Sequence, residues 1–319
     1  MTADSIRLCT LTDGHAGNVR QAQSLARALG AAPRDLVLRP RAPWRWLAPR
    51  ALPFAGRAFG DAFAALLAQP PAVAIGCGRQ AALATRLLRA RGSRAVQILD
   101  PRIDPAHWDL VIAPDHDGLQ GRNVVTLLGS LNPVDDAWLA DARAAFPAFA
   151  ALPAPRTAVL VGGDSAHYAF DAAAFERLAA RIDAAAGGGS LLVTTSRRTP
   201  PGVVQALRAR WSVRADTMLW CEPSDGPNPY AGLLAWADRL ACTPDSVNML
   251  SEACATTAPV HVFEPERVDG RPRRFLDALL RRGRIRALDD AMAPFEAVPL
   301  RETARVAAEL RTRLNLPRP

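Results

Sequence analysis

The chain has 319 residues, of which 49% are hydrophobic and 22% charged, and this composition excludes a largely disordered protein. The length suits two domains of roughly 150 residues each. All 39 basic residues are arginine, against 31 acidic residues, which gives a formal charge of +8. Because alanine and proline are also abundant, the charge indicates a compositional bias typical of GC-rich bacterial genomes. We therefore expect no nucleic-acid partner.

The five cysteines show no C-x-x-C spacing and are odd in number, which argues against a disulfide framework. We expect buried, reduced thiols. The amino-terminal end has no basic segment followed by an apolar core, and no apolar run reaches the roughly 20 residues that span a membrane. The sequence predicts a cytoplasmic protein, with peripheral attachment to the inner face of the cytoplasmic membrane left open.

Short apolar runs alternate with longer helical periods through the first half of the chain. This rhythm predicts a parallel sheet covered by helices on both faces. The expected helices include residues 19–29 and 79–91. The expected strands are residues 6–11, 35–40, 72–77, 94–99, 109–114 and 123–128.

A Pro- and Ala-rich stretch at residues 147–156 is the predicted linker, after which the same rhythm restarts. We predict an α/β protein of two Rossmann-like, doubly wound domains that face each other across a cleft, at residues 1–150 and 151–319. The amphipathic stretch 300–315 is expected to pack back over their junction. Strands are expected at residues 157–163, 190–196, 216–221, 238–243 and 259–264.

The loop after the first expected strand reads DGHAGN and carries Asp13, His15 and Asn18. Ligands of open parallel sheets bind beyond the carboxyl ends of the strands, where glycines let the chain turn and helix amino-termini attract anions. The functional interpretation places His15 and Asn18 against a phosphate or a reacting hydroxyl. The alternative is a tight turn that Asp13 caps. The loop matches neither a Walker motif nor G-x-G-x-x-G.

Three strand-end loops of the second half suit a nucleotide. Residues 162–165 are expected to form a backbone nest for a diphosphate, with an ordinary turn as the alternative. Arg197 and Arg198 are expected to neutralise phosphate, unless they are simply solvated. Asp245 or Ser246 is expected to cap a helix, and Glu252, unless solvated, to bind the hydroxyls of a ribose. The full set is Gly162, Gly163, Asp164, Ser165, Thr195, Ser196, Arg197, Arg198, Thr243, Asp245, Ser246, Asn248, Met249 and Glu252.

Strand ends of the first half supply further polar candidates for the side of the cleft that faces an acceptor. His116 between two aspartates resembles a metal site, but no third separated ligand is evident, so we expect a polar loop and no metal. The candidates are Gly14, Gly17, Gly76, Gly78, Arg79, Gln80, Asp100, Arg102, Asp115 and His116.

Residues 39–60 interleave arginines, among them Arg41 and Arg45, with aromatic residues. One interpretation is a patch that rests on an anionic membrane through Trp44 and Trp46. The other is the buried aromatic edge of a helix. The sequence leaves both open.

Seven motifs together resemble the Elm-type mitochondrial fission family, and two such halves resemble a GT-B glycosyltransferase. The motif TPDSVNMLSEA resembles the donor-nucleotide segment of the lipid II-forming N-acetylglucosaminyltransferase, whose glutamate grips the ribose. The resemblance covers nearly the whole chain. The motifs, in chain order, are DGHAGNVRQAQSLA, IGCGRQ, VQILDPR, DLVIAPDHD, VGGDSAHY, TTSRRTP and TPDSVNMLSEA.

The resemblance implies roles for individual residues. Gly162, Gly163 and Ser165 would line the diphosphate, Ser246 and the helix start would face phosphate, and Glu252 would face the ribose. Asn228 and Tyr230 would border the base or the sugar. His15 would act on the acceptor side as a general base or as a donor to the sugar phosphate. The first loop has one glycine fewer than the corresponding loops of those enzymes.

The sequence thus predicts a metal-independent transferase that moves a sugar from a nucleotide-diphosphate sugar to an envelope or lipid-linked acceptor, with no cofactor beyond the donor. One alternative is a nucleotide-sugar epimerase, which would need extra catalytic carboxylates such as Asp100, Asp115 or Asp117. Another is a non-catalytic scaffold that acts in membrane or division assemblies through the Trp/Arg segment. Fold alone does not decide among them.

Overall fold

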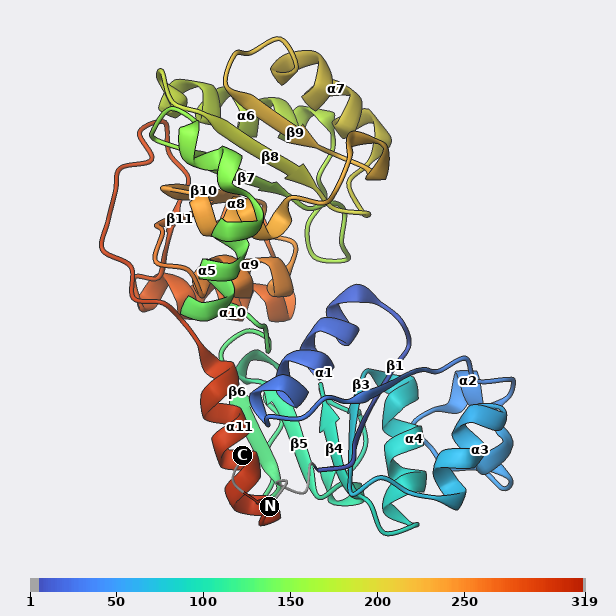
Figure 1. The fold of residues 1–319 in the computed structure, drawn as a ribbon. Helices are drawn as coiled ribbons and strands as arrows, with labels where there is room; N and C mark the ends of the chain where they lie inside the picture. The colour runs from blue at the N-terminus through green and yellow to red at the C-terminus, as the bar shows by residue number, and fades with distance from the viewer. Residues whose placement is uncertain (1–5, 318–319) are drawn as a thin grey trace. The chain divides into compact units, whose positions relative to one another are not determined.

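The computed structural model describes residues 6–317. The chain forms two compact units, one made of Met1–Pro133 with Glu302–Pro319 and the other of Val134–Arg301. Each unit is built on one six-stranded sheet with helices packed against it (Figure 1). Every strand pair in both sheets is parallel. The predicted α/β class with two Rossmann-like units is therefore confirmed.

The sheet of the N-terminal unit has the strand order β2-β1-β3-β4-β5-β6. After β1 the chain forms β2 at one edge of the sheet and then crosses to the other side of β1, where it forms β3. The strand order therefore reverses between β1 and β3. All six strands predicted for this half are present. Their bounds are β1 Leu8–Thr12, β2 Arg34–Val37, β3 Val73–Cys77, β4 Arg94–Ile98, β5 Leu110–Pro114 and β6 Val124–Leu127.

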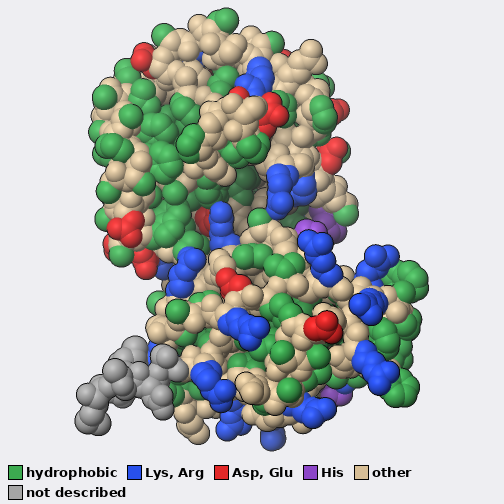
Figure 2. Space-filling model, turned by 45° about the vertical axis from the view of Figure 1, so that its right-hand side comes forward, with side chains coloured by type: hydrophobic (Ala, Val, Ile, Leu, Met, Phe, Trp, Pro, Cys, Tyr) green, Lys and Arg blue, Asp and Glu red, His purple; other side chains and the backbone are tan. Residues whose placement is uncertain are grey.

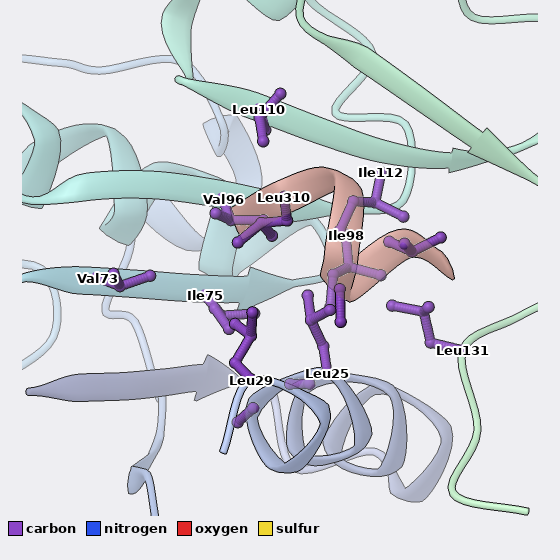
Figure 3. Close-up of a cluster of buried hydrophobic side chains, with 14 of the residues drawn as sticks. Leu25, Leu29, Val73, Ile75, Val96, Ile98, Leu110, Ile112, Leu131 and Leu310 are labelled. Atoms are coloured by element: carbon purple, nitrogen blue, oxygen red, sulfur yellow. The ribbon is translucent and has the colours of Figure 1, made fainter. Parts of the chain in front are cut away.

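Helices cover both faces of this sheet, because alternate strand residues point to opposite sides. Val73 and Ile75 join the cluster that contains Leu25 of α1 and Leu310 of α11 (Figure 3). Ala74, between them in sequence, joins the cluster formed by α3 and α4 on the other face. The helices are α1 Ala16–Ala28, α2 Trp44–Leu47, α3 Asp61–Ala68, α4 Arg79–Arg89 and α11 Glu302–Leu314.

The C-terminal helix α11 belongs to the N-terminal unit, in which it packs against α1 and β6. Val306, Ala307 and Leu310 are buried in that core. The Thr303 hydroxyl donates to the carbonyl of Asn132 at 2.8 Å and accepts from its N–H at 3.0 Å. The amphipathic pattern predicted this helix, which returns from the C-terminal unit to the N-terminal unit, where its apolar face completes one hydrophobic core.

The sheet of the C-terminal unit has the order β12-β11-β10-β7-β8-β9, which reverses between β7 and β10. The sequence missed β12, because only one of its three residues is buried and its pattern is not an apolar run. The strands are β7 Thr157–Val161, β8 Leu191–Thr195, β9 Thr217–Trp220, β10 Arg239–Cys242, β11 Val260–Val262 and β12 Ile285–Ala287. The helices are α5 Asp136–Ala145, α6 Ala172–Ala186, α7 Pro201–Trp211, α8 Tyr230–Trp236, α9 Val247–Cys254 and α10 Gly270–Arg281.

The Pro- and Ala-rich stretch 147–156 does not separate the two units. It begins with the 3-10 helix Pro147–Ala151, and the helix before it, α5, packs against α8. The Arg143 Nε donates to the carbonyl of Ala235 at 2.9 Å, and a Cβ on Gly232 would lie 2.6 Å from the Phe146 ring. The division therefore falls after Pro133 and not after residue 150.

Candidate functional site

The two loops at the strand-order reversal of the C-terminal unit interlock. One follows β7 and carries Gly162 and Gly163, and the other follows β10 and carries Thr243, Asp245 and Ser246. In open parallel sheets the crevice at such a reversal is the usual ligand site.

The Asp245 carboxylate joins the loops of this site, and its side chain is wholly buried. It accepts hydrogen bonds from the Gly163 N–H at 3.1 Å, the Thr243 hydroxyl at 2.7 Å and the Arg198 Nη2 at 2.6 Å. The Thr243 hydroxyl accepts in turn from the Gly162 N–H at 2.7 Å. A buried carboxylate is stable only when it is paired and hydrogen-bonded, and this one is both.

Glycine is required at positions 162 and 163 because neighbouring atoms leave no room for a Cβ, and not because of the backbone conformation. A Cβ on Gly162 would lie 1.9 Å from the Asp245 Oδ1, and a Cβ on Gly163 would lie 2.0 Å from the Arg198 carbonyl oxygen. The N–H groups of Gly162, Gly163 and Ser165 all donate to protein acceptors, that of Ser165 to the Tyr168 carbonyl. Three of the four N–H groups of the expected backbone nest for a diphosphate are thus already engaged within the protein.

The two adjacent arginines differ in how they are held. The Arg198 side chain is 47% exposed and anchored by Asp245, and its Nη1 also donates to the Asp164 carbonyl at 3.2 Å. Arg197 is exposed. Arg198 therefore presents a half-exposed guanidinium of fixed orientation beside the two loops, a difference that the sequence, with two adjacent arginines, did not reveal.

The Ser196 and Thr199 hydroxyls shape the loop that carries Arg198. Ser196 accepts from the Arg198 N–H at 3.1 Å, and Thr199 donates to the carbonyl of Gly162. Thr199 was not singled out from the sequence, and its only signal is its place before two prolines. Thr195 donates to the Cys221 carbonyl at 3.0 Å, which makes it a structural residue.

Helix α9 begins at this site with the predicted cap. The Ser246 Oγ accepts from the Met249 N–H at 3.3 Å, and Asn248 and Met249 are half-buried in the first turn. The amino-terminus of a helix attracts anions through its N–H groups and dipole. Glu252 is only 3% exposed, so a ribose would reach it only after neighbouring side chains move.

The other residues expected around the nucleotide lie on separate loops. Asp164 accepts from the Phe170 N–H at 2.6 Å, so its carboxylate orders the loop after β7. The Asn228 Oδ1 accepts from the Tyr230 N–H at 3.0 Å at the start of α8. These contacts give both residues a local structural role.

The strand-order reversal of the N-terminal unit holds the loop DGHAGN. The Asp13 Oδ1 accepts from the His15 N–H at 3.0 Å and from the Asn18 Nδ2 at 2.9 Å. A Cβ on Gly78, at the end of β3, would lie 2.8 Å from the same Asn18 Nδ2. The buried Cys77 Sγ donates to the Asn18 Oδ1 at 3.5 Å. The predicted cap by Asp13 is therefore present, and Asn18 is held between the two loops.

His15 combines exposure with a fixed partner. Its side chain is 78% exposed, and its Nδ1 lies 3.0 Å from the Asp13 Oδ2. Burial alone would raise the pKa of Asp13, but hydrogen bonds from Asn18 and His15 outweigh it and lower that pKa below its ordinary value. An ionised carboxylate on Nδ1 leaves Nε2 as the acceptor for a substrate proton, which is the arrangement of a general base.

The remaining acceptor-side candidates each have local contacts or a local place in the fold. Arg79 donates to the carbonyls of Trp46 and Arg45, and Asp100 pairs with Arg102 at 3.2 Å. Gly76 is buried against Thr85. The others are Gly14 with φ +82° in the loop after β1, Gly17 in α1, Gln80 in α4, and Asp115 and His116 in a 3-10 turn after β5.

Residues 6–317 hold no group of three His, Cys, Asp or Glu side chains that is arranged to bind a metal ion. The Asp–His–Asp run of residues 115–117 therefore has no third separated ligand within that range.

Comparison with known proteins agrees with this architecture. Residues 16–314 match the family described as "Mitochondrial fission ELM1". The "Mitochondrial fission protein ELM1" of Arabidopsis thaliana is 30% identical over 275 residues, which cover 76% of this chain and 64% of the plant protein. The chain thus spans less than two thirds of that relative.

Two solved structures show the shared fold. A UDP-GlcNAc 2-epimerase from Neisseria meningitidis, bound to UDP-GlcNAc, superposes with a TM-score of 0.55 at 12% sequence identity. The superposition covers 97% of this chain and 100% of the epimerase chain. A spinosyn forosaminyltransferase superposes with a TM-score of 0.50 at 13% sequence identity, over 98% of this chain and 95% of the transferase chain. The chain belongs to the mitochondrial fission ELM1 family and has the two-unit Rossmann-like fold of GT-B glycosyltransferases and UDP-GlcNAc 2-epimerases.

Proposed function

We propose that this protein is a metal-independent glycosyltransferase of the GT-B type that uses a nucleotide-diphosphate sugar as donor. The observation that carries the proposal is the guanidinium of Arg198, held by the buried Asp245 beside the amino-terminus of α9. Both features favour a diphosphate, and they meet where doubly wound sheets bind ligands. The epimerase with the same fold is a UDP-GlcNAc complex, which supports this class of ligand.

The C-terminal unit carries the nucleotide in this proposal. Arg198, the Ser246 hydroxyl and the first turn of α9 stabilise the negative charge of the leaving diphosphate. Glu252 receives the ribose hydroxyls once the first turns of α9 adjust around them. The Gly162 and Gly163 N–H groups already donate to acceptors within the protein. Binding of the diphosphate therefore depends more on Arg198 than it would at a loop with free N–H groups.

The N-terminal unit supplies the base. The His15 Nε2 takes the proton of the acceptor hydroxyl, and the hydroxyl oxygen forms a bond to the anomeric carbon. The bond from that carbon to the diphosphate oxygen breaks, and its electron pair leaves with the nucleotide. Asp13 holds the imidazole and stabilises it once it is protonated. The acceptor is an envelope glycan or a lipid-linked sugar.

A second candidate is epimerisation of the nucleotide sugar, favoured by the fold shared with UDP-GlcNAc 2-epimerases. Such an enzyme needs carboxylates that act on the sugar. Asp100 is engaged by Arg102, and Asp115 is exposed in a turn. The two activities separate in one assay, because epimerisation converts the nucleotide sugar without any acceptor, whereas transfer requires one.

Thermal unfolding with UDP-, GDP-, ADP-, CMP- and dTDP-sugars tests the donor site. We expect one nucleotide class to raise the melting temperature, by mass action on the folded state. Arg198→Ala should remove that rise, and Arg197→Ala, which removes the same charge from the adjacent exposed position, should keep it. The absence of any shift with all five classes would contradict the proposal, as would equal losses in the two variants.

A further inference from the structure

The surface that the proposed reaction leaves unexplained is the Arg/aromatic segment, residues 39–60, between β2 and α3. It contains Arg39, Arg41, Arg45, Arg50 and Arg57 and no acidic residue. Among residues 6–317, none of these five guanidiniums forms an ion pair with a carboxylate. This distinguishes the segment from the arginines of the C-terminal unit, many of which are paired.

The structure divides the aromatic side chains of the segment into two pairs. Trp44 and Phe59 are half-buried and pack on the cluster that contains Leu83. Trp46 and Phe54 point outward, 61% and 73% exposed, and Leu47, next to Trp46 in the chain, is 39% exposed. The buried-edge interpretation therefore holds for the first pair. Trp44, which the sequence also offered for a membrane patch, packs part of its ring on that cluster.

The backbone places the Phe54 ring in solvent at a cost. Phe54 has φ +61° and ψ 17°, in the left-handed region that side chains other than glycine and asparagine rarely adopt. A strained residue normally gains burial or a contact in return. This ring remains largely exposed, and its contact is the Arg57 guanidinium 5.6 Å from the ring centre.

Two arginines of α4 hold the backbone of the segment in place by hydrogen bonds to its carbonyl groups. Arg79 donates to the carbonyls of Trp46 and Arg45 at 3.0 and 3.2 Å, and Arg86 donates to the Pro49 carbonyl at 2.5 Å. The outward side chains therefore project from a backbone that is tied to a buried helix. Figure 2 shows apolar and arginine side chains side by side along one edge of the N-terminal unit.

We propose that the Arg/aromatic segment binds the surface of a bilayer that contains anionic lipids. Trp46, Leu47 and Phe54 enter the headgroup region, where amphipathic and aromatic side chains are stabilised. Arg45, which lies 5.6 Å over the Trp46 ring, and Arg57 remain at the level of the lipid phosphates. The described residues contain no helix long and apolar enough to cross a bilayer, so the attachment proposed is peripheral.

Sedimentation of the full chain with phosphatidylcholine vesicles, with and without phosphatidylglycerol, tests the proposal. We expect binding only to the anionic vesicles, and weaker binding at high salt. The double variant Trp46→Ala, Phe54→Ala should bind at least about tenfold more weakly. Replacement of Arg45 and Arg57 by alanine should cost roughly fivefold for each lost charge.

Matched controls lie on the other unit. Val213→Ala removes an apolar side chain that is 86% exposed, and Arg282→Ala removes an exposed arginine. Both should bind like the parent. Unchanged binding of the Trp46/Phe54 variant, equal binding to neutral vesicles, or no binding to either would overturn the proposal. The assay contains no nucleotide, and Arg198→Ala should bind vesicles normally, so its outcome is independent of the donor site.

Discussion

The two strand-order reversals of this protein have the same topology and different chemistry. The reversal in the C-terminal unit is closed from within, by a buried carboxylate that an arginine and backbone N–H groups satisfy. The reversal in the N-terminal unit presents an exposed imidazole on a carboxylate of lowered pKa. A closed network fixes a charge in place, whereas an exposed Asp–His pair can exchange a proton. The fold provides the position, and the side chains decide between binding and chemistry.

The largest loss of stability is expected when a side chain is added at Gly163, where two loops of the C-terminal unit lie against each other. Gly163→Ala places a Cβ 2.0 Å from the Arg198 carbonyl, so the two loops must separate, and we expect a loss of about 3 kcal/mol in the free energy of unfolding. Urea titration followed by circular dichroism measures this loss. Gly202→Ala in α7, where a new Cβ meets no atom within 4 Å, should be neutral or stabilising. Equal behaviour of the two variants would contradict the close approach.

Removing the buried charge should have the next largest effect on stability. Asp245→Asn keeps the shape of the side chain but places an amide against the donors Arg198 and Gly163, and we expect a loss of about 2 kcal/mol. Asp13→Asn, whose charged partner His15 is largely exposed, should lose at most about 1 kcal/mol. The same urea titration compares them. A larger loss at Asp13 would reverse the assignment of the structural and the chemical carboxylate.

The order of Asp245→Asn and Asp13→Asn should invert when the rate of sugar transfer is measured instead of stability. Asp13→Asn removes the charge that stabilises protonated His15, and we expect kcat for sugar transfer to fall by about tenfold to a hundredfold. His15→Ala should be at least as slow. The KM for the nucleotide sugar should remain within about twofold in both. A change confined to KM would show that this loop binds the donor instead of accepting a proton.

The smallest effect is a pH dependence of stability. The pKa of Asp13 is lower in the folded protein than its ordinary value, so its ionised form contributes stability above that ordinary value, near pH 4. That contribution is lost as the pH falls through the folded-state pKa. We expect the difference in melting temperature between the parent and Asp13→Asn to shrink below about pH 4. A constant difference down to pH 2.5 would contradict the lowered pKa.

The sequence predicted most of the fold because strands of parallel sheets are continuous apolar runs, as in 73–77 and 157–161. It missed β12, which is mostly exposed, and it placed the boundary too late because proline and alanine also suit the 3-10 helix at Pro147–Ala151. Local features of the site, such as the Ser246 cap, were predictable. The contact of Arg198 with Asp245 was not, because these residues lie 47 positions apart and no local pattern joins them.

Calorimetric titration of the nucleotide sugar identified by thermal unfolding tests most directly whether Arg198 binds the donor and His15 does not, with Arg198→Ala and His15→Ala compared with the parent. We expect Arg198→Ala to bind at least about tenfold more weakly, because a charge-assisted contact with the diphosphate is lost, and His15→Ala to bind as the parent does. Weaker binding of His15→Ala together with unchanged binding of Arg198→Ala would contradict these roles.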